Sequence, residues 1–178
     1  MYFCVPYSSP VGRLTLASGG DALSGLWLEG QKYFGGSLGP LETREDLPVF
    51  EQVKTWLDRY FARARPDPAE LPLAPVGSEF RQEVWRLLLR IPYGKVTTYG
   101  ALSKELARLL GRPHMSAQAV GGAVGHNPIS IIIPCHRVVG ADGSLTGYAG
   151  GVEIKRKLLE LEGADLSGLY LPDRGTAL

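Results

Sequence analysis

The sequence predicts an α+β protein, with a small antiparallel sheet in the first half and a mostly helical second half. Apolar and polar side chains alternate over residues 1–30 between turn signals, which is typical of short paired strands. Apolar residues then recur at helical spacing over residues 47–65. Further helical patterns begin only after a proline-rich segment at residues 65–75, where the lack of backbone N–H groups prevents a helix from continuing.

The strand-like stretches are "YFCVPYSS", "GRLTLAS" and "ALSGLWLE", separated by the turn signals Ser9-Pro10 and Gly19-Gly20-Asp21. The helical stretch that follows can cover one face of this sheet with Phe50, Val53, Leu57, Tyr60 and Phe61. The segment "RPDPAELPLAP" contains four prolines and predicts a linker. We therefore expect one domain over residues 1–75 that ends in this linker, a second over residues 76–165 and a C-terminal tail over residues 166–178.

Capping residues mark the helices of the second half. Ser78 can cap a helix whose apolar stripe contains Phe80, Val84, Leu87 and Leu88. Thr98 can cap the next helix, which should end before Gly111, and Ser116 can cap a third one in "AQAVGGAVG". Helix, short turn and helix in this order predict a helix-turn-helix motif.

The third of these helices contains two adjacent glycines, Gly121 and Gly122. Each weakens a helix by roughly 1 kcal/mol relative to alanine. Glycine at such positions lets another backbone or a ligand approach the helix closely. Close packing against another helix inside the protein explains the pattern equally well.

Composition places the chain among soluble globular proteins, since 44% of its 178 residues are hydrophobic and 21% are charged. It has neither a membrane-spanning apolar run nor a recognisable signal peptide, so we expect a cytoplasmic protein with no membrane contact. The only cysteines, Cys4 and Cys135, form no C-x-x-C pair, and we expect neither a metal nor another cofactor. Residues 80–157 carry 11 basic and 4 acidic side chains, which suits a polyanion such as DNA, although a solvated basic face is an equal alternative.

The stretch "SIIIPCHRVVG", residues 130–140, places a cysteine and a histidine together behind a proline. We expect the isoleucines to form a strand that ends at Pro134, with Cys135 at its tip. A thiol reacts as the thiolate, so it needs a nearby base or positive charge, and His136 is the nearest candidate base. An inert buried cysteine and a structural histidine are the alternatives.

Two longer stretches carry a family resemblance. "NPISIIIPCHRVVGADGSLTGYAGGVEIKRKLLELEG", residues 127–163, together with "FRQEVWRLLLRIPYGKVTTYGALS", residues 80–103, resembles the O6-alkylguanine-DNA alkyltransferases. The resemblance implies a ribonuclease-H-like N-terminal domain and a helix-turn-helix, winged-helix-like C-terminal domain. It also implies direct-reversal DNA repair, in which a damaged guanine is flipped out of the helix and its O6-alkyl group moves irreversibly to the protein. O4-alkylthymine is a further candidate substrate.

The resemblance assigns roles to the reaction centre. Cys135 is the alkyl acceptor, and His136 takes its proton through a water molecule. Glu162 holds and polarises His136, while Asn127 fixes the local backbone and water. Tyr99 protonates the departing guanine or lies against the target nucleotide. Such a relay predicts a Cys135 pKa below that of free cysteine.

The remaining roles concern substrate and DNA. The resemblance places Val138, Tyr148, Ala149 and Gly150 at the substrate pocket. It places Ser116, Ala117, Gln118, Gly121, Gly122 and Arg137 at the minor groove of double-stranded DNA, and Lys155, Arg156 and Lys157 are further candidates for phosphate contacts. We expect a monomer.

Two features depart from the family pattern. Gln118 stands where the family commonly has an arginine that fills the space left by the flipped base, and residues 105–118 are a few residues longer than expected. Two other functions compete with alkyl transfer. A cysteine hydrolase built on Cys135 and His136 would turn over, and a helix-turn-helix regulator would bind undamaged DNA and leave Cys135 unreactive.

Overall fold

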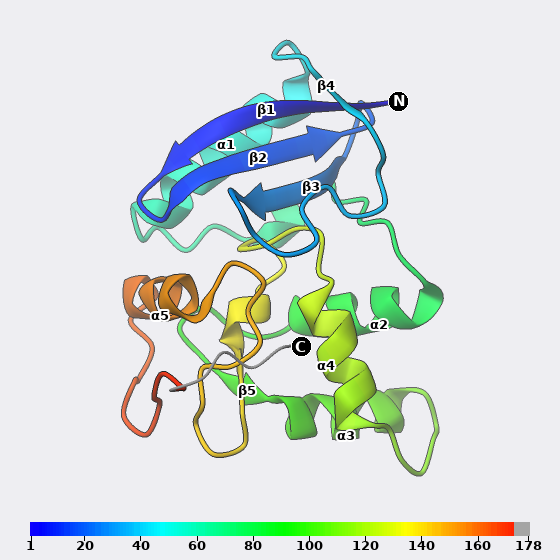
Figure 1. The fold of residues 1–178 in the computed structure, drawn as a ribbon, viewed down its shortest axis with the longest axis vertical. Coiled ribbons are helices and arrows are strands. Elements are labelled where there is room, and N and C mark those ends of the chain that lie inside the picture. The colour runs from blue at the N-terminus through cyan, green and yellow to red at the C-terminus, as the bar shows by residue number, and fades with distance from the viewer. Residues whose placement is uncertain (173–178) are drawn as a thin grey trace.

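The computed structural model describes residues 1–172 and confirms the predicted α+β class. The sheet and the helix that covers it form one layer, and the helices of the C-terminal half form a second layer beneath it (Figure 1). Residues 128–137 run between these two layers. The segment that contains Cys135 is therefore enclosed from both halves of the chain.

The N-terminal sheet has the predicted antiparallel meander. Strands β1 (Tyr2–Ser9), β2 (Gly12–Ser18) and β3 (Leu23–Leu28) pair in sequence, and a fourth strand, β4 (Leu41–Thr43), pairs in parallel with β1. The sequence did not predict β4, because three residues carry too little alternation to be read as a strand. Helix α1 (Pro48–Phe61) packs its apolar stripe on the sheet, as predicted.

Three capped helices follow in the C-terminal half. They are α2 (Glu79–Leu88), α3 (Tyr99–Leu109) and α4 (Ala117–Gly125). Each predicted cap is present: the side-chain oxygens of Ser78, Thr98 and Ser116 accept hydrogen bonds from the third backbone N–H that follows, at 3.3, 3.1 and 3.2 Å. These caps confirm the starts of all three helices.

Shorter elements complete the second half. The 3-10 helix η1 (Pro68–Glu70) lies in the proline-rich segment, and η2 (Cys135–Arg137) carries the cysteine. Strands β5 (Thr97–Thr98) and β6 (Val138–Val139) form a parallel pair, and the last helix is α5 (Val152–Leu161). Residues 166–171 of the predicted tail contribute leucines that pack on Val139, Leu145 and Leu159, whereas residues 173–178 of that tail lie outside the described chain.

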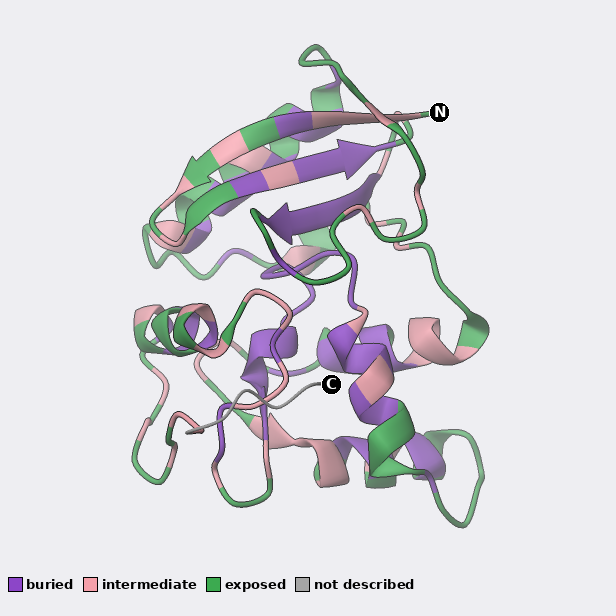
Figure 2. Ribbon diagram, viewed as in Figure 1, coloured by how far each residue is buried: buried purple, intermediate pink, exposed green. Residues whose placement is uncertain are grey.

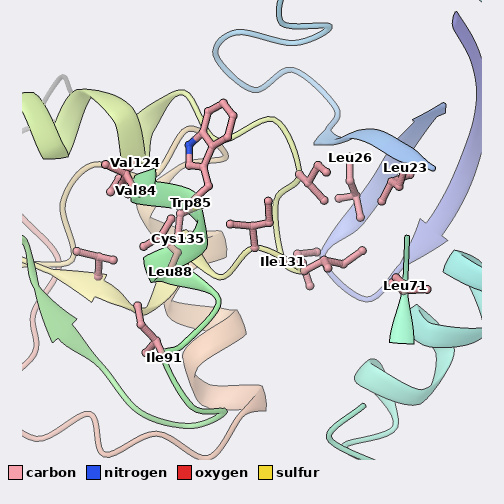
Figure 3. Close-up of a cluster of buried hydrophobic side chains, with 14 of the residues drawn as sticks. Leu23, Leu26, Leu71, Val84, Trp85, Leu88, Ile91, Val124, Ile131 and Cys135 are labelled. Carbon is pink, nitrogen blue, oxygen red and sulfur yellow. The ribbon is translucent and has the colours of Figure 1, made fainter. Parts of the chain in front are cut away.

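The edge of the N-terminal sheet holds the segment that leads to Cys135. Leu26 of β3 donates its N–H to the carbonyl of Pro128 at 2.8 Å and accepts from the N–H of Ser130 at 3.0 Å. Strand β3 and this segment are both buried (Figure 2). A single hydrophobic cluster continues from Leu23 and Leu26 of β3 to Cys135 (Figure 3). The two halves therefore share one core at this point.

The prediction of a strand over the three isoleucines is wrong. Only Ile129 forms a bridge to β3, and two tight turns follow, in which Ile132 and Cys135 donate to the carbonyls two residues earlier, each at 2.8 Å. Ile131 has a φ of 72°, which is rare for a β-branched residue and strained. A run of apolar residues indicates that a segment is buried, but it does not specify the backbone conformation. Here the segment is buried between two layers without forming a strand.

Candidate active site

Cys135 lies at the start of η2, and its side chain is only 7% exposed. It belongs to the same buried cluster as Val84 and Leu88 of α2 (Figure 3). This burial raises the pKa of the thiol, and a hydrogen bond from Asn127 and the charge of Lys155 offset only part of that effect. The expectation of a lowered Cys135 pKa is therefore wrong for the resting protein, in which the thiol is the stable form.

Asn127 braces the turn in front of Cys135. Its amide nitrogen donates to the carbonyl of Ile133 at 2.8 Å, and its amide oxygen accepts from the N–H of Ile129 at 3.0 Å. Both bonds are buried. They satisfy backbone groups that the irregular chain leaves without partners in a strand or helix.

His136 is completely buried and contacts Glu162. Its Nε2 atom lies 2.6 Å from Oε2 of Glu162. Burial by itself would raise the Glu162 pKa, but the hydrogen bonds from His136 and Arg137 and the charge of Arg137 prevail and hold it well below its usual range. Burial lowers the His136 pKa, so the ring is neutral at rest. An ionised carboxylate requires Nε2 to donate, and Nδ1 is then a buried acceptor with no partner among the described residues.

Glu162 accepts further hydrogen bonds from several parts of the chain. Arg137 donates from Nε to Oε1 at 2.8 Å and from Nη2 to Oε2 at 3.0 Å. The hydroxyl of Tyr60, from α1, donates to Oε2 at 2.6 Å, and the N–H of Gly94 donates to Oε1 at 3.1 Å. Sequence reasoning missed Tyr60 and Gly94, because Tyr60 read as an ordinary core residue of α1 and Gly94 contributes only a backbone N–H, which no side-chain pattern shows.

Two basic side chains that were expected to face DNA point inward. Arg137 is 7% exposed, and besides Glu162 it binds the carbonyl of Ile91 at 2.6 Å. Lys155 is 0% exposed and donates from Nζ to the carbonyl of Thr146 at 2.7 Å. The structure contradicts a phosphate contact for either side chain, because neither cation reaches the surface. Arg156 and Lys157 are exposed on the outer face of α5.

Tyr99 and Tyr148 both lie near Cys135. Tyr99 donates its hydroxyl to the carbonyl of Thr146 at 3.1 Å, and burial, followed by the proximity of Cys135, raises its pKa. Burial and Cys135 likewise raise the pKa of Tyr148. Both hydroxyls therefore keep their protons near neutral pH. The Tyr148 hydroxyl has no hydrogen-bond partner among the described residues, although Ser130 lies near enough to influence its pKa.

The other three residues expected at the pocket differ in exposure. Ala149 and Gly150 are half-buried and follow Tyr148 in a loop. A Cβ atom on Gly150 would lie 2.8 Å from a methyl carbon of Leu28, so this loop packs directly on β3. Val138 is fully buried in β6, where it pairs with Thr97. Val138 therefore belongs to the buried cluster that includes Cys135 and offers no exposed surface to a substrate.

The first turn of α4 presents the expected DNA-facing residues to solvent. Ser116, Ala117 and Gln118 are exposed, Gly122 is half-buried and Gly121 is buried (Figure 2). A Cβ atom added to Gly122 would meet no atom within 4 Å. Packing inside the protein therefore does not require glycine at position 122, which favours the close approach of an external molecule over internal packing.

Within residues 1–172, no group of three or more potential metal-binding side chains gathers at one place. The helices in this part of the chain also lack the length and apolar character needed to cross a bilayer.

Comparison with known proteins identifies the family. The model of the 6-O-methylguanine DNA methyltransferase DNA-binding domain matches residues 79–164, and that of its ribonuclease-like domain matches residues 3–75. The methylated-DNA–protein-cysteine methyltransferase of Haemophilus influenzae is 45% identical over 88% of this chain and 83% of its own. The Mycobacterium tuberculosis protein of that name is 46% identical over 86% and 88%.

Solved structures agree with this assignment. A crystal structure of Mycobacterium tuberculosis OGT in complex with DNA covers 90% of this chain and 91% of its own, with a TM-score of 0.74 and 43% identity. Another crystal structure, of the Mycobacterium tuberculosis O6-methylguanine methyltransferase, has a TM-score of 0.75 and 41% identity over 98% of this chain and 97% of its own. The chain therefore belongs to the 6-O-methylguanine DNA methyltransferase family.

Proposed function

We propose that this protein repairs DNA by direct reversal, moving an alkyl group from O6 of guanine to Sγ of Cys135. The observation that carries the proposal is the buried contact of His136 with Glu162 directly beside Cys135, in a chain of this family. Nδ1 of His136 has no partner among the described residues and is free to accept a proton, while Glu162 stabilises the other ring nitrogen. This arrangement suits proton removal from a thiol that burial otherwise keeps protonated.

The transfer is a single displacement. The thiol proton passes through a water molecule to Nδ1 of His136, and the thiolate attacks the alkyl carbon. The new C–S bond forms as the C–O bond breaks, and the electron pair of that bond goes to the guanine. Glu162 stabilises the imidazolium through the Nε2 hydrogen bond, so no buried positive charge is left without a partner.

The guanine gains a proton as it leaves. Tyr99 is the proposed donor, because its hydroxyl lies near Cys135 and is protonated before the reaction. Its raised pKa makes the remaining tyrosinate a strong base, which recovers the proton from the protonated His136 through solvent, so the net transfer is the Cys135 thiol proton to guanine. Tyr148 lies against the substrate with a hydroxyl that a base can satisfy. The product is a thioether with no electrophilic carbonyl, and water has no easy route to restore the thiol. Each molecule therefore reacts once.

Double-stranded DNA is the proposed partner, with α4 in the minor groove. Flipping a base out of the stack costs a few kcal/mol, so the DNA backbone must approach the protein closely to offset that cost. Gly122 leaves space for such an approach, and Gln118 projects from the first turn of α4. A neutral glutamine there leaves more of the affinity to exposed basic side chains such as Arg156 and Lys157.

The deciding experiment is intact-mass analysis after incubation with an oligonucleotide that contains O6-methylguanine. We expect one methyl group per protein molecule, mapped to Cys135. Cys135→Ser should bind the lesion without accepting the group, and Cys4→Ser is the matched control that should react normally, since Cys4 lies in β1. Product in excess of one equivalent would instead favour a hydrolase, and an unmodified Cys135 would favour a DNA-binding regulator.

A further inference from the structure

Tyr60 is the one side chain of the N-terminal half whose hydrogen bond reaches Glu162 among the described residues. It lies on α1, 102 residues earlier in the sequence, and donates its hydroxyl to Oε2 at 2.6 Å. The direction of this bond is settled, because burial and the neighbouring Glu162 raise the Tyr60 pKa while that of Glu162 is held low. The tyrosine therefore keeps its proton, and the carboxylate accepts it.

Oε2 is also the atom that holds His136. It accepts from His136 at 2.6 Å, from Tyr60 at 2.6 Å and from Nη2 of Arg137 at 3.0 Å. Donors that share one oxygen compete for its electron density, so each weakens the bonds of the others. Tyr60 is thus separated from the imidazole by a single atom, although it is distant from the reacting sulfur in sequence.

Glu162 is also held in place by groups other than Tyr60. Arg137 binds both carboxylate oxygens, and the N–H of Gly94 binds Oε1 at 3.1 Å. The Tyr60 ring is likewise held without its hydroxyl, since it stacks on Trp56 with centroids 5.6 Å apart and meets Phe61 edge-on at 5.1 Å. The separate contribution of the hydroxyl is therefore its effect on the charge of Oε2.

We propose that Tyr60 is a positioning residue of the N-terminal half that shares Oε2 of Glu162 with His136 and thereby limits how strongly Glu162 stabilises a protonated His136. This inference rests on the proposed function, because it concerns the same proton transfer from Cys135. It gives the N-terminal half a part in the chemistry besides covering the site. Loss of the hydroxyl leaves more of the carboxylate charge for His136 and favours the thiolate and imidazolium pair.

Other charged or titratable groups also influence this pair. Glu162, Arg137 and Lys155 act on His136, and Cys135 is influenced by Lys155, Tyr99 and Tyr148. All of them remain in place in a Tyr60→Phe variant. A change in the titration of Cys135 and His136 in that variant can therefore be assigned to the loss of the Tyr60 hydroxyl.

The test is the pH dependence of Cys135 alkylation by iodoacetamide, with the modified cysteine identified by mass spectrometry. The midpoint belongs to the coupled Cys135 and His136 titration. We expect Tyr60→Phe to move it to lower pH by about half a unit, because the imidazolium is better stabilised. An unchanged midpoint, or a shift to higher pH, would overturn the proposal.

Tyr7→Phe is the matched control. The Tyr7 hydroxyl donates to Oδ1 of Asp58, also on α1, at 2.6 Å, and this bond has no link to Glu162. Its loss should leave the midpoint unchanged. In a Glu162→Gln background, Tyr60→Phe should have no further effect, and an equal shift in that background would count against the shared carboxylate.

A second variant keeps the test decisive if Tyr60→Phe folds poorly. Site-specific replacement of Tyr60 by 3-fluorotyrosine retains the ring and makes the hydroxyl a stronger donor, so the midpoint should move to higher pH. A shift in the opposite direction would overturn the proposal. Since iodoacetamide needs no DNA, failure of the wild-type protein to accept a methyl group from DNA would refute the function without affecting this result.

Discussion

The surroundings of Cys135 and the first turn of α4 use polar side chains in opposite ways. Around Cys135 the polar groups bond to one another: Glu162 receives hydrogen bonds from His136, Arg137, Tyr60 and Gly94. At the first turn of α4, Ser116 caps the helix, but Gln118 ends in solvent. Apart from Nδ1 of His136 and the Tyr148 hydroxyl, the buried side-chain nitrogen and oxygen atoms around Cys135 have partners among the described residues, whereas Gln118 is left for a partner molecule to bind.

This difference separates two kinds of mutational effect. A buried network is costly to break, because each group left without its partner was already removed from water. An exposed side chain costs the protein little when it changes, and its effect appears only when the partner binds. Substitutions near Cys135 should therefore alter stability and rate, whereas those on α4 should alter DNA binding.

Glu162→Gln should have the largest effect on the buried region. It leaves Arg137 as a buried cation without a carboxylate, and removing one member of such a pair costs roughly 3–5 kcal/mol of unfolding free energy. Urea denaturation measures this loss. The exposed Glu160, which pairs with Arg156 at 2.9 Å, provides the control Glu160→Gln. Equal losses in both variants would remove the distinction between the regions.

The Glu162 pKa also fixes the sign of a pH effect. Its value is lower in the folded protein than the 4.5 of the free side chain, so the unfolded state binds the proton more tightly. The stabilisation is fully present above about pH 4.5 and is lost as the pH falls toward the folded value. The free energy of unfolding of Glu162→Gln should therefore decrease less steeply than that of the wild-type protein as the pH is lowered.

Lys155→Met tests a second buried cation, which binds the carbonyl of Thr146, whereas Arg137 pairs with a carboxylate. Burial lowers the Lys155 pKa from 10.5 to about 8, so the unfolded state binds more protons between these values. Stability from this group therefore rises as the pH increases through that interval, by roughly 3 kcal/mol in total. Lys155→Met should abolish this rise in denaturation curves, and Lys157→Met, at an exposed position of the same helix, should retain it. A wild-type protein with no such rise would contradict the prediction.

Gly122→Ala should raise the stability of the protein and weaken its binding to DNA. Alanine favours a helix by about 1 kcal/mol over glycine, and the new methyl group meets no atom of the protein within 4 Å. Thermal stability should therefore increase. Binding of lesion-containing DNA should weaken, because the methyl group takes the space proposed for the DNA backbone. Fluorescence anisotropy measures the affinity, and unchanged binding would place the DNA elsewhere.

Gln118→Arg should have the smallest effect on the stability of the protein and a measurable effect on DNA binding. The new charge should tighten binding and, if it meets a phosphate, steepen the plot of log affinity against log salt by about one unit. Repair of a free alkylated base, which needs no flipping, should hardly change. An equal acceleration of the free-base and duplex reactions would show that Gln118 acts at the pocket.

Local patterns in the sequence predicted the parts of the fold that local physics controls. Ser78, Thr98 and Ser116 cap their helices because a side-chain oxygen satisfies a backbone N–H three residues away, whatever lies beyond. The antiparallel meander likewise follows from alternation and turns. The prediction of a strand before Cys135 was wrong, because a run of isoleucines indicates a segment that is buried on all sides but does not specify its backbone conformation.

The site was predictable in its residue types and much less so in their surroundings. By itself the sequence determined that Cys135 and His136 are adjacent, that Gln118 lies in the first turn of a capped helix, and that two glycines lie within that helix. Only the tertiary structure decided that Arg137 and Lys155 turn inward, that burial raises the Cys135 pKa, and that Tyr60 reaches Glu162 from the other half of the chain. The physical reason is that burial and hydrogen-bond partners are set by contacts between residues far apart in sequence, which no local pattern records.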